Sequence, residues 1–127
     1  MPKVSKESAS GGGDHGPVVD RSEDLEDYSV NFVTFRENID HAPLLKGLPD
    51  DMCTCPHWGH VTTGSVTFTH VDGSTETFTA GDAFYVEPGH TPVIEPGTEV
   101  LFISPEKQIA VVNAVIEANM AAMAGAQ

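Results

Sequence analysis

The feature that most constrains the fold is a run of closely spaced turns in the second half of the chain. Between Gly64 and Ser104, short segments rich in β-branched and aromatic residues alternate with turn pairs, namely Asp72-Gly73, Gly81-Asp82, Pro88-Gly89 and Pro96-Gly97. Glycine takes the positive φ that tight turns of this kind demand. Short strands with a turn at each end predict an antiparallel sandwich or small barrel. We therefore expect an all-β domain.

Two segments on either side of these turns extend the prediction. Residues 28–37 alternate apolar and polar side chains, which predicts a further strand. After Ser104 the apolar residues recur at helical spacing, and they are Ile109, Val112, Ile116, Met120 and Met123. Ser104 suits a helix N-cap and Pro105 suits the first helical position. The sequence thus predicts a barrel over residues 25–104 and one amphipathic C-terminal α-helix over residues 105–127.

The N-terminal 24 residues have a different composition. They contain three consecutive glycines, several serines and five acidic residues, but few apolar side chains. Segments that cannot bury apolar surface do not gain enough free energy to become ordered. We therefore expect residues 1–24 to form a disordered acidic tail.

The charge balance excludes two classes of partner. The chain has 6 Lys and Arg against 19 Asp and Glu, which gives a formal charge of -13. Such a field repels phosphate backbones and anionic membranes, so neither nucleic acid nor a membrane surface is an expected partner. The sequence has no apolar run long enough to span a bilayer, and its N-terminus lacks the apolar stretch of a secretory signal. These features predict a cytoplasmic protein.

The two cysteines are separated by one residue, at Cys53 and Cys55. Reducing conditions in the cytoplasm argue against a structural disulfide, and a bridge between such close strand positions is strained. Metal binding, plain burial and redox chemistry stay open as roles. The redox role is disfavoured because Lys46 is the nearest cation in sequence, so nothing obvious lowers the thiol pKa.

Several motifs resemble the cupin superfamily. The string AGDAFYVEPGH resembles the second cupin motif, with Gly81 and Gly89 at its glycine positions. The string HVTTGSVTF resembles the end of the first motif, with Gly64 as its closing glycine. The longer string LPDDMCTCPHWGHV is similar to a group of small bacterial cupins without an assigned reaction. The resemblance implies a double-stranded β-helix, or jelly roll, and a homodimer.

The chain departs from this family at the usual metal ligands. Where the first motif has two histidines and a glutamate, this sequence has Asp51, Cys53 and His57. Where the second motif has its histidine, this sequence has Pro92, and His90 lies two residues earlier. The three-histidine, one-glutamate site of the family is therefore absent.

A different ligand set overlaps these positions. Alternation along a strand points residues 53, 55 and 57 the same way, and the cupin register directs that side into the barrel. His90 has the same parity as the family's inward position. Cys53, Cys55, His57 and His90 thus form a candidate tetrahedral zinc site. Pro56 weakens the prediction, since a proline can bulge a strand.

Three other residues are further candidates for a role at the site. Asp51 is an alternative ligand to Cys55 or a solvated turn residue. His60 lies at the rim of the barrel in this register, and Glu87 is either an acid at the barrel mouth or a solvated turn carboxylate.

Three functions are compatible with the sequence. The first is a metal-binding cupin that holds a small organic ligand in its barrel, with the reaction and any catalysis unspecified. The second is a non-catalytic module that binds or senses a ligand or metal. The third is a thiol redox protein. The apolar stripe from Ile109 to Met123 offers a surface for a homodimer.

Overall fold

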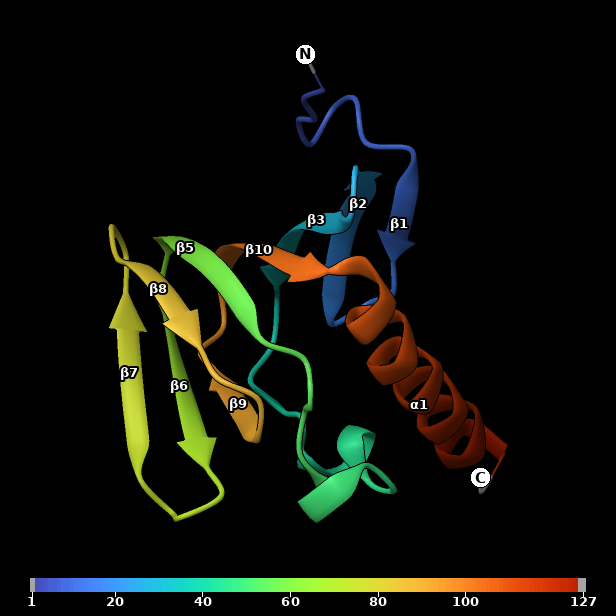
Figure 1. Ribbon diagram of the computed structural model, residues 1–127, viewed down its shortest axis with the longest axis vertical. Coiled ribbons are helices and arrows are strands. Elements are labelled where there is room, and N and C mark those ends of the chain that lie inside the picture. The colour runs from blue at the N-terminus through green and yellow to red at the C-terminus, as the bar shows by residue number, and fades with distance from the viewer. Residues whose placement is uncertain (1, 126–127) are drawn as a thin grey trace.

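Two antiparallel β-sheets and one C-terminal helix make up the protein, as the computed structural model of residues 2–125 shows (Figure 1). The larger sheet has the strand order β1-β2-β3-β10-β5-β8. Its strands are β1 (Gly11–Asp14), β2 (Val18–Leu25), β3 (Tyr28–Phe35), β10 (Thr98–Pro105), β5 (His57–Thr63) and β8 (Ala83–Val86). The smaller sheet has the order β4-β9-β6-β7. Its strands are β4 (Ile39–Asp40), β9 (His90–Ile94), β6 (Ser65–His70) and β7 (Thr75–Thr79). The expectation of a mainly antiparallel β fold with one C-terminal helix is confirmed.

The space between the two sheets is filled by one hydrophobic cluster, which we call the sheet cluster. Its buried members are Val33, Phe35, Val61, Val66, Phe68, Phe84, Val86, Ile94 and Val100. Aromatic rings pack closely within it: Phe78 stacks on Phe84 with ring centroids 4.8 Å apart, and Phe68 lies 5.7 Å from Phe84. This packing holds the two sheets face to face.

Two glycines let the strands approach each other. Gly64 has a φ of 84°, and a Cβ there would overlap the Thr98 side chain. Gly59 lies on β5, where a Cβ would overlap the Phe84 ring. Both positions exclude larger residues because of the space they leave for a neighbouring chain segment.

The connection between the sheets contains two short 3-10 turns, η1 (Ala42–Leu45) and η2 (Pro49–Asp51). The helix α1 (Glu106–Gly125) packs on η1 and is tied to it by the Asn119 amide, which donates to the Leu44 carbonyl at 2.6 Å. A second hydrophobic cluster, the helix cluster, lies between them and consists of Leu45, Leu48, Cys53, Cys55 and Val112.

The helix starts later than the sequence predicts. Ser104 and Pro105 are the last residues of β10, so Ser104 is not an N-cap, and α1 begins at Glu106. Both residues continue the pairing of β10 with β3, Ser104 opposite Ser29 and Pro105 opposite Tyr28. Sheet pairing overrides the local capping preference here. The predicted helical residues 126 and 127 lie outside the described residues.

The prediction of a disordered N-terminal tail is wrong for two segments within it. Residues 11–14 form β1, and residues 18–24 belong to β2, which pairs with β3 from Val18 opposite Phe35 to Leu25 opposite Tyr28. Ala9 is also buried, and the Arg21 guanidinium donates to its carbonyl oxygen. Composition failed as a guide because a strand added to a sheet gains backbone hydrogen bonds whatever its side chains. The division into a barrel over 25–104 and a helix over 105–127 stays a prediction.

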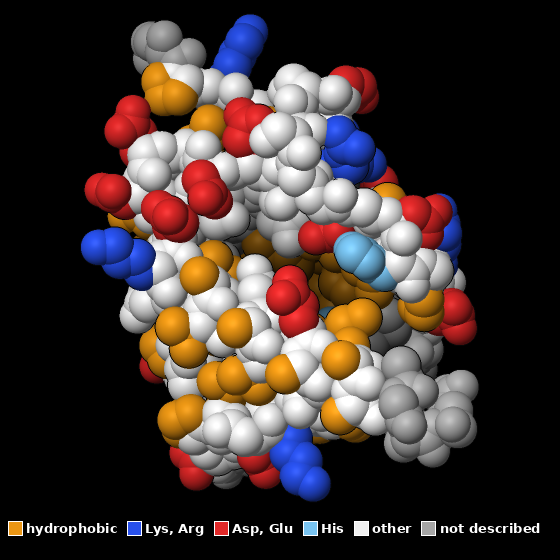
Figure 2. All heavy atoms as spheres, turned by 90° about the vertical axis from the view of Figure 1, so that its right-hand side faces the viewer, with side chains coloured by type: hydrophobic (Ala, Val, Ile, Leu, Met, Phe, Trp, Pro, Cys, Tyr) orange, Lys and Arg blue, Asp and Glu red, His pale blue; other side chains and the backbone are white. Residues whose placement is uncertain are grey.

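The outward side of α1 is largely apolar. Val111, Met120 and Met123 are 59%, 44% and 53% exposed. Figure 2 shows hydrophobic side chains gathered across the lower half of the molecule, on the side where α1 lies. In the described part of the chain, no helix is long and apolar enough to cross a membrane.

Candidate metal centre

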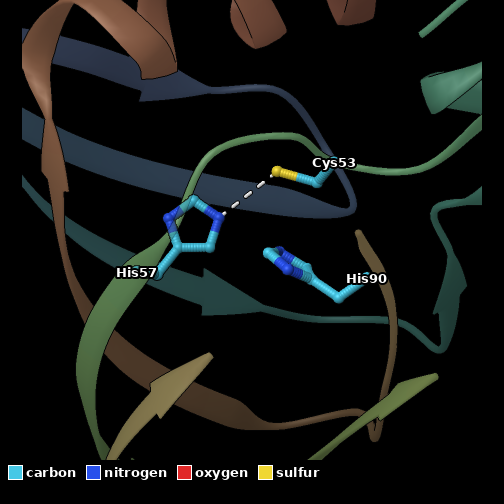
Figure 3. Close-up of side chains that lie close together, drawn as sticks. All are labelled: Cys53, His57 and His90. Carbon is cyan, nitrogen blue, oxygen red and sulfur yellow. Dashed lines mark hydrogen bonds between the residues drawn. The ribbon is translucent and has the colours of Figure 1, made fainter. Parts of the chain in front are cut away.

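Three side chains from separate segments converge in the interior. Cys53, His57 and His90 each offer one ligand atom, and these atoms lie within 4.8 Å of one another (Figure 3). Each of the three residues is buried. Cys53 Sγ and His57 Nε2 lie 3.4 Å apart, a separation that suits two donors on one ion with bonds of about 2.0–2.3 Å.

Backbone pairing sets the position of Cys53 relative to His90. The two residues form an isolated antiparallel bridge, in which the Cys53 amide donates to the His90 carbonyl at 2.8 Å. The Gly89 amide in turn donates to the Cys53 carbonyl at 2.8 Å. The segment after η2 is thereby fixed against the start of β9. The Cys53 thiol and the His90 imidazole therefore lie on the same side of the site (Figure 3).

His57 is held by a hydrogen bond at each ring nitrogen. Its Nδ1 lies 2.7 Å from the Ser104 hydroxyl on β10, and its Nε2 lies 3.4 Å from Cys53 Sγ. Its ring also contacts the rings of Phe102, at a centroid distance of 5.5 Å, and His90, at 5.0 Å. The imidazole thus has one orientation, with Nε2 toward the thiol.

His90 has a backbone partner instead of a side-chain partner. Its Nδ1 donates to the Glu87 carbonyl oxygen, because a carbonyl can only accept. Nε2 is then the unprotonated nitrogen that remains for a ligand. A ligand histidine whose other nitrogen is hydrogen-bonded is the common arrangement at metal sites.

Burial keeps both imidazoles neutral. It lowers the pKa of His57 to about 3, with the neighbouring His90 adding to the effect. Burial also lowers the pKa of His90, partly opposed by its hydrogen bond to Glu87. Neutral imidazole is the form that binds a metal, so these histidines need not lose a proton to do so at neutral pH.

Burial has the opposite consequence for the thiols. It raises the pKa of Cys53 to about 11 and that of Cys55 to about 12, where the proximity of Cys53 adds to the increase. Both groups are therefore thiols at neutral pH unless a metal displaces the proton. Reactive cysteines have lowered pKa values, so this environment argues against the redox hypothesis.

The structure does not bring Cys55 into the group of three. Its thiol donates to the Pro56 carbonyl at 3.3 Å and packs in the helix cluster with Leu48 and Val112. The predicted alternation fails because β5 begins only at His57, so residues 53–56 are not a regular strand. Of the four predicted ligands, Cys53, His57 and His90 lie together.

The other candidate residues lie elsewhere. Asp51 is exposed with a φ of 53°, and its carboxylate accepts from the Gly47 amide at 2.9 Å, so it is a turn residue. His60 lines a hollow of about 370 Å³ with Phe32 and Leu101. Glu87 serves the site through its carbonyl, and it also lines a separate depression beside His70.

Sequence reasoning missed Ser104 as a site residue. Because serine is a common helix N-cap, the sequence suggested that Ser104 precedes the helix. It lies instead on β10, which pairs with β5, and its hydroxyl is next to His57. Continuing the apolar alternation of Val100 and Phe102 by one step would have found it, since both side chains face the interior.

Solved structures of similar fold identify the architecture. An RMLC-like cupin from Shewanella frigidimarina is 18% identical with a TM-score of 0.54, over 80% of this chain and 88% of that one. The polyketide cyclase RemF from Streptomyces resistomycificus is 16% identical with a TM-score of 0.57, over 84% and 80%. A protein of unknown function from Rhizobium leguminosarum is 19% identical with a TM-score of 0.55, over 82% and 95%.

No protein-family model matches the sequence, and no curated protein is similar to it. The structural likenesses define the class: this chain is a small protein with the cupin fold. At these identities the likeness carries the fold alone, so the function has to be argued from the site.

Proposed function

We propose that this protein is a metal-binding cupin that holds one divalent ion between Cys53, His57 and His90. The observation that supports it is the convergence of these three buried donors, two of them neutral imidazoles with their second nitrogen already hydrogen-bonded. One thiolate and two imidazoles suit zinc best among abundant divalent metals.

Three protein ligands leave a fourth position on a tetrahedral ion. Structural zinc sites in proteins are closed by four protein ligands, whereas open sites admit water or a donor atom of a small organic molecule. The proposed function is therefore to hold a small ligand at the metal, where a bound ion would supply Lewis-acid chemistry.

A second candidate is a non-catalytic sensing module, which the exposed apolar side of α1 favours. A homodimer formed through Val111, Met120 and Met123 would bury this surface. The helix cluster joins α1 to Cys53, so metal binding and the helix share one packed region. Both candidates are proposed for a cytoplasmic protein.

Metal analysis of protein purified without a histidine tag tests the proposal. We expect about one equivalent of zinc in the wild-type protein and almost none in Cys53→Ala or His57→Ala. His15→Ala is the matched control, because this histidine is half exposed and pairs with Asp20 far from the site. Wild-type protein that neither retains zinc nor binds it on titration would refute the proposal.

A further inference from the structure

The tryptophan and the tyrosines of this chain gather in one exposed place. The sequence contains one tryptophan, Trp58, and two tyrosines, Tyr28 and Tyr85. Tyr28, Trp58 and Tyr85 are 45%, 44% and 46% exposed, whereas each of the six phenylalanines is buried or half-buried. Filling of the core therefore accounts for the phenylalanines but not for these three rings, which we call the aromatic corner.

The aromatic corner lies on the outer face of the larger sheet. Trp58 on β5 pairs with Tyr85 on β8. The neighbours of Trp58 along the strand, His57 and Gly59, face the interior, so alternation turns the indole outward. Tyr28 begins β3, on the far side of β10, and its ring reaches the Trp58 ring at a centroid distance of 6.4 Å. Strands position side chains more firmly than loops do, so these rings have a rigid support.

The three rings are steeply inclined to one another. The planes of Tyr28 and Trp58 meet at 80°, and those of Trp58 and Tyr85 at 48° with centroids 4.9 Å apart. A flat ligand can stack on only one ring of such a set at a time. A compact cation is attracted to any ring face within about 6 Å of the centroid, so it can contact inclined rings together. Tryptophan binds cations best among the aromatic side chains.

The charge around the aromatic corner also favours a cation. Glu26 and Asp27 are exposed and directly precede Tyr28. Glu106 lies beside them, since its amide donates to the Asp27 carbonyl at 2.9 Å. One basic residue, Lys107, follows Glu106, so acidic residues outnumber basic ones at this end of the corner. The formal charge of -13 on the whole chain adds a field that attracts cations and repels anions.

We propose that the aromatic corner is a binding site for a quaternary ammonium group, as carried by small trimethylammonium compounds. Such a group has an apolar surface and no N–H, so ring faces can replace its hydration without a hydrogen-bond acceptor. A primary ammonium is more strongly hydrated and fits the corner less well. The site lies on the opposite face of β5 from the candidate metal centre, because Trp58 and His57 are adjacent residues of one strand.

Titration with choline, followed by tryptophan fluorescence, is the first test. Trp58 is the only tryptophan, so the signal reports on the aromatic corner alone. We expect a saturable change with a half-point on the order of 1 mM, as suits a small ligand at an exposed site. The neutral analogue of choline, in which carbon replaces the quaternary nitrogen, should bind about tenfold more weakly. Sodium chloride at matched concentrations controls for ionic strength. Equal responses to choline and its neutral analogue, or no saturable response to choline, would overturn the inference.

Paired substitutions of the tyrosines separate cation binding from apolar contact. Tyr28→Phe and Tyr85→Phe keep the ring and should bind choline nearly as well as wild type. Tyr28→Leu and Tyr85→Leu keep an apolar side chain without the ring, and each should weaken binding about fivefold, the loss of one exposed cation–π contact. Val111→Ala, at an exposed apolar position on α1, is the control. Wild-type affinity in both leucine variants would overturn the inference.

Sedimentation distinguishes a ligand site from a contact between two copies of the chain. We expect Tyr28→Leu and Tyr85→Leu to leave the oligomeric state of wild type unchanged. A dimer that these variants dissociate, with no choline binding by wild type, would make the aromatic corner a subunit interface and overturn the inference. All of these measurements use chelator-treated protein, so their outcome is independent of the proposed metal function.

Discussion

The sheet cluster and the helix cluster are both hydrophobic, but their residues reach the interior by different routes. The sheet cluster is formed by residues that alternate along regular strands, such as Val66 and Phe68 on β6. The helix cluster is formed by the irregular residues 45–55 and by one face of α1, and it contains Cys53 and Cys55. The candidate metal centre lies where the two regions meet, since Phe68 contacts His90 and Cys53 belongs to the helix cluster. If the proposed ion binds, we expect it to stabilise the helix cluster more than the sheet cluster, because only the helix cluster contains the candidate ligand Cys53.

The largest expected effect is in the sheet cluster. Phe68→Ala removes a ring that is 1% exposed and contacts Phe78, Phe84 and His90. We expect a loss of about 3–5 kcal/mol in the free energy of unfolding, as is usual for a buried phenylalanine. Urea denaturation should give similar losses with zinc and with a chelator. A loss that appeared only in the presence of zinc would contradict the separation of the two regions.

Removal of the metal should have the next largest effect. A ligand that binds only the folded state stabilises it by about 2.7 kcal/mol when its free concentration is 100 times its Kd. We expect a chelator to abolish this stabilisation in wild type and to leave the Tm of Cys53→Ala unchanged. Scanning calorimetry measures both. An equal response of the variant and wild type to the chelator would exclude Cys53 as a ligand.

A smaller effect is expected in the helix cluster. Val112→Ala removes two buried methylene equivalents, each contributing roughly 0.8 kcal/mol, so the loss should be about 1.6 kcal/mol. Because Val112 and Cys53 share this cluster, the variant should also bind zinc more weakly. Val111→Ala is the control, since its side chain is mostly exposed. Identical zinc affinities in the Val112 variant and wild type would show that the packing of α1 does not affect zinc binding.

Acid should destabilise the metal-free protein gradually. The pKa of His57 falls from its ordinary value of 6.5 to about 3 on folding. Above pH 6.5 neither state binds this proton, so stability is fully present there. As the pH falls from 6.5 toward 3, only the unfolded state binds a proton at His57. The free energy of unfolding therefore decreases by about 1.4 kcal/mol per pH unit. Urea denaturation of chelator-treated protein should show this slope, reduced in His57→Gln. A flat profile below pH 6 would contradict burial of the neutral ring.

The smallest effect is expected at the N-terminus. Deleting residues 1–10 removes the exposed Lys6–Glu99 ion pair and the contact of Ala9 with Arg21, but leaves β1 and β2 in place. Surface ion pairs contribute little, so the Tm should fall by no more than a few degrees. A larger fall would show that this segment is packed as firmly as the strands.

The turns and the alternation of side chains were readable from the sequence because both are local. A glycine at a positive φ, such as Gly73 or Gly81, has the same signature in any fold, and the apolar side of β6 follows from the pleat of the strand. The N-terminal strands could not be read in this way. Their stability comes from backbone pairing with β3, a distant partner that composition does not reveal.

The candidate site shows the same difference between what local sequence predicts and what long-range packing decides. By itself the sequence determined which donors are present, that Cys53 and His57 stand at ligand positions of the cupin motif, and that His90 lies two residues before another such position. Only the tertiary structure decided that Cys55 turns toward Pro56 and that Ser104 faces His57. The physical reason is that the regular strand β5 begins only at His57. In the irregular residues before it, the direction of a side chain depends on long-range packing and not on whether its residue number is odd or even.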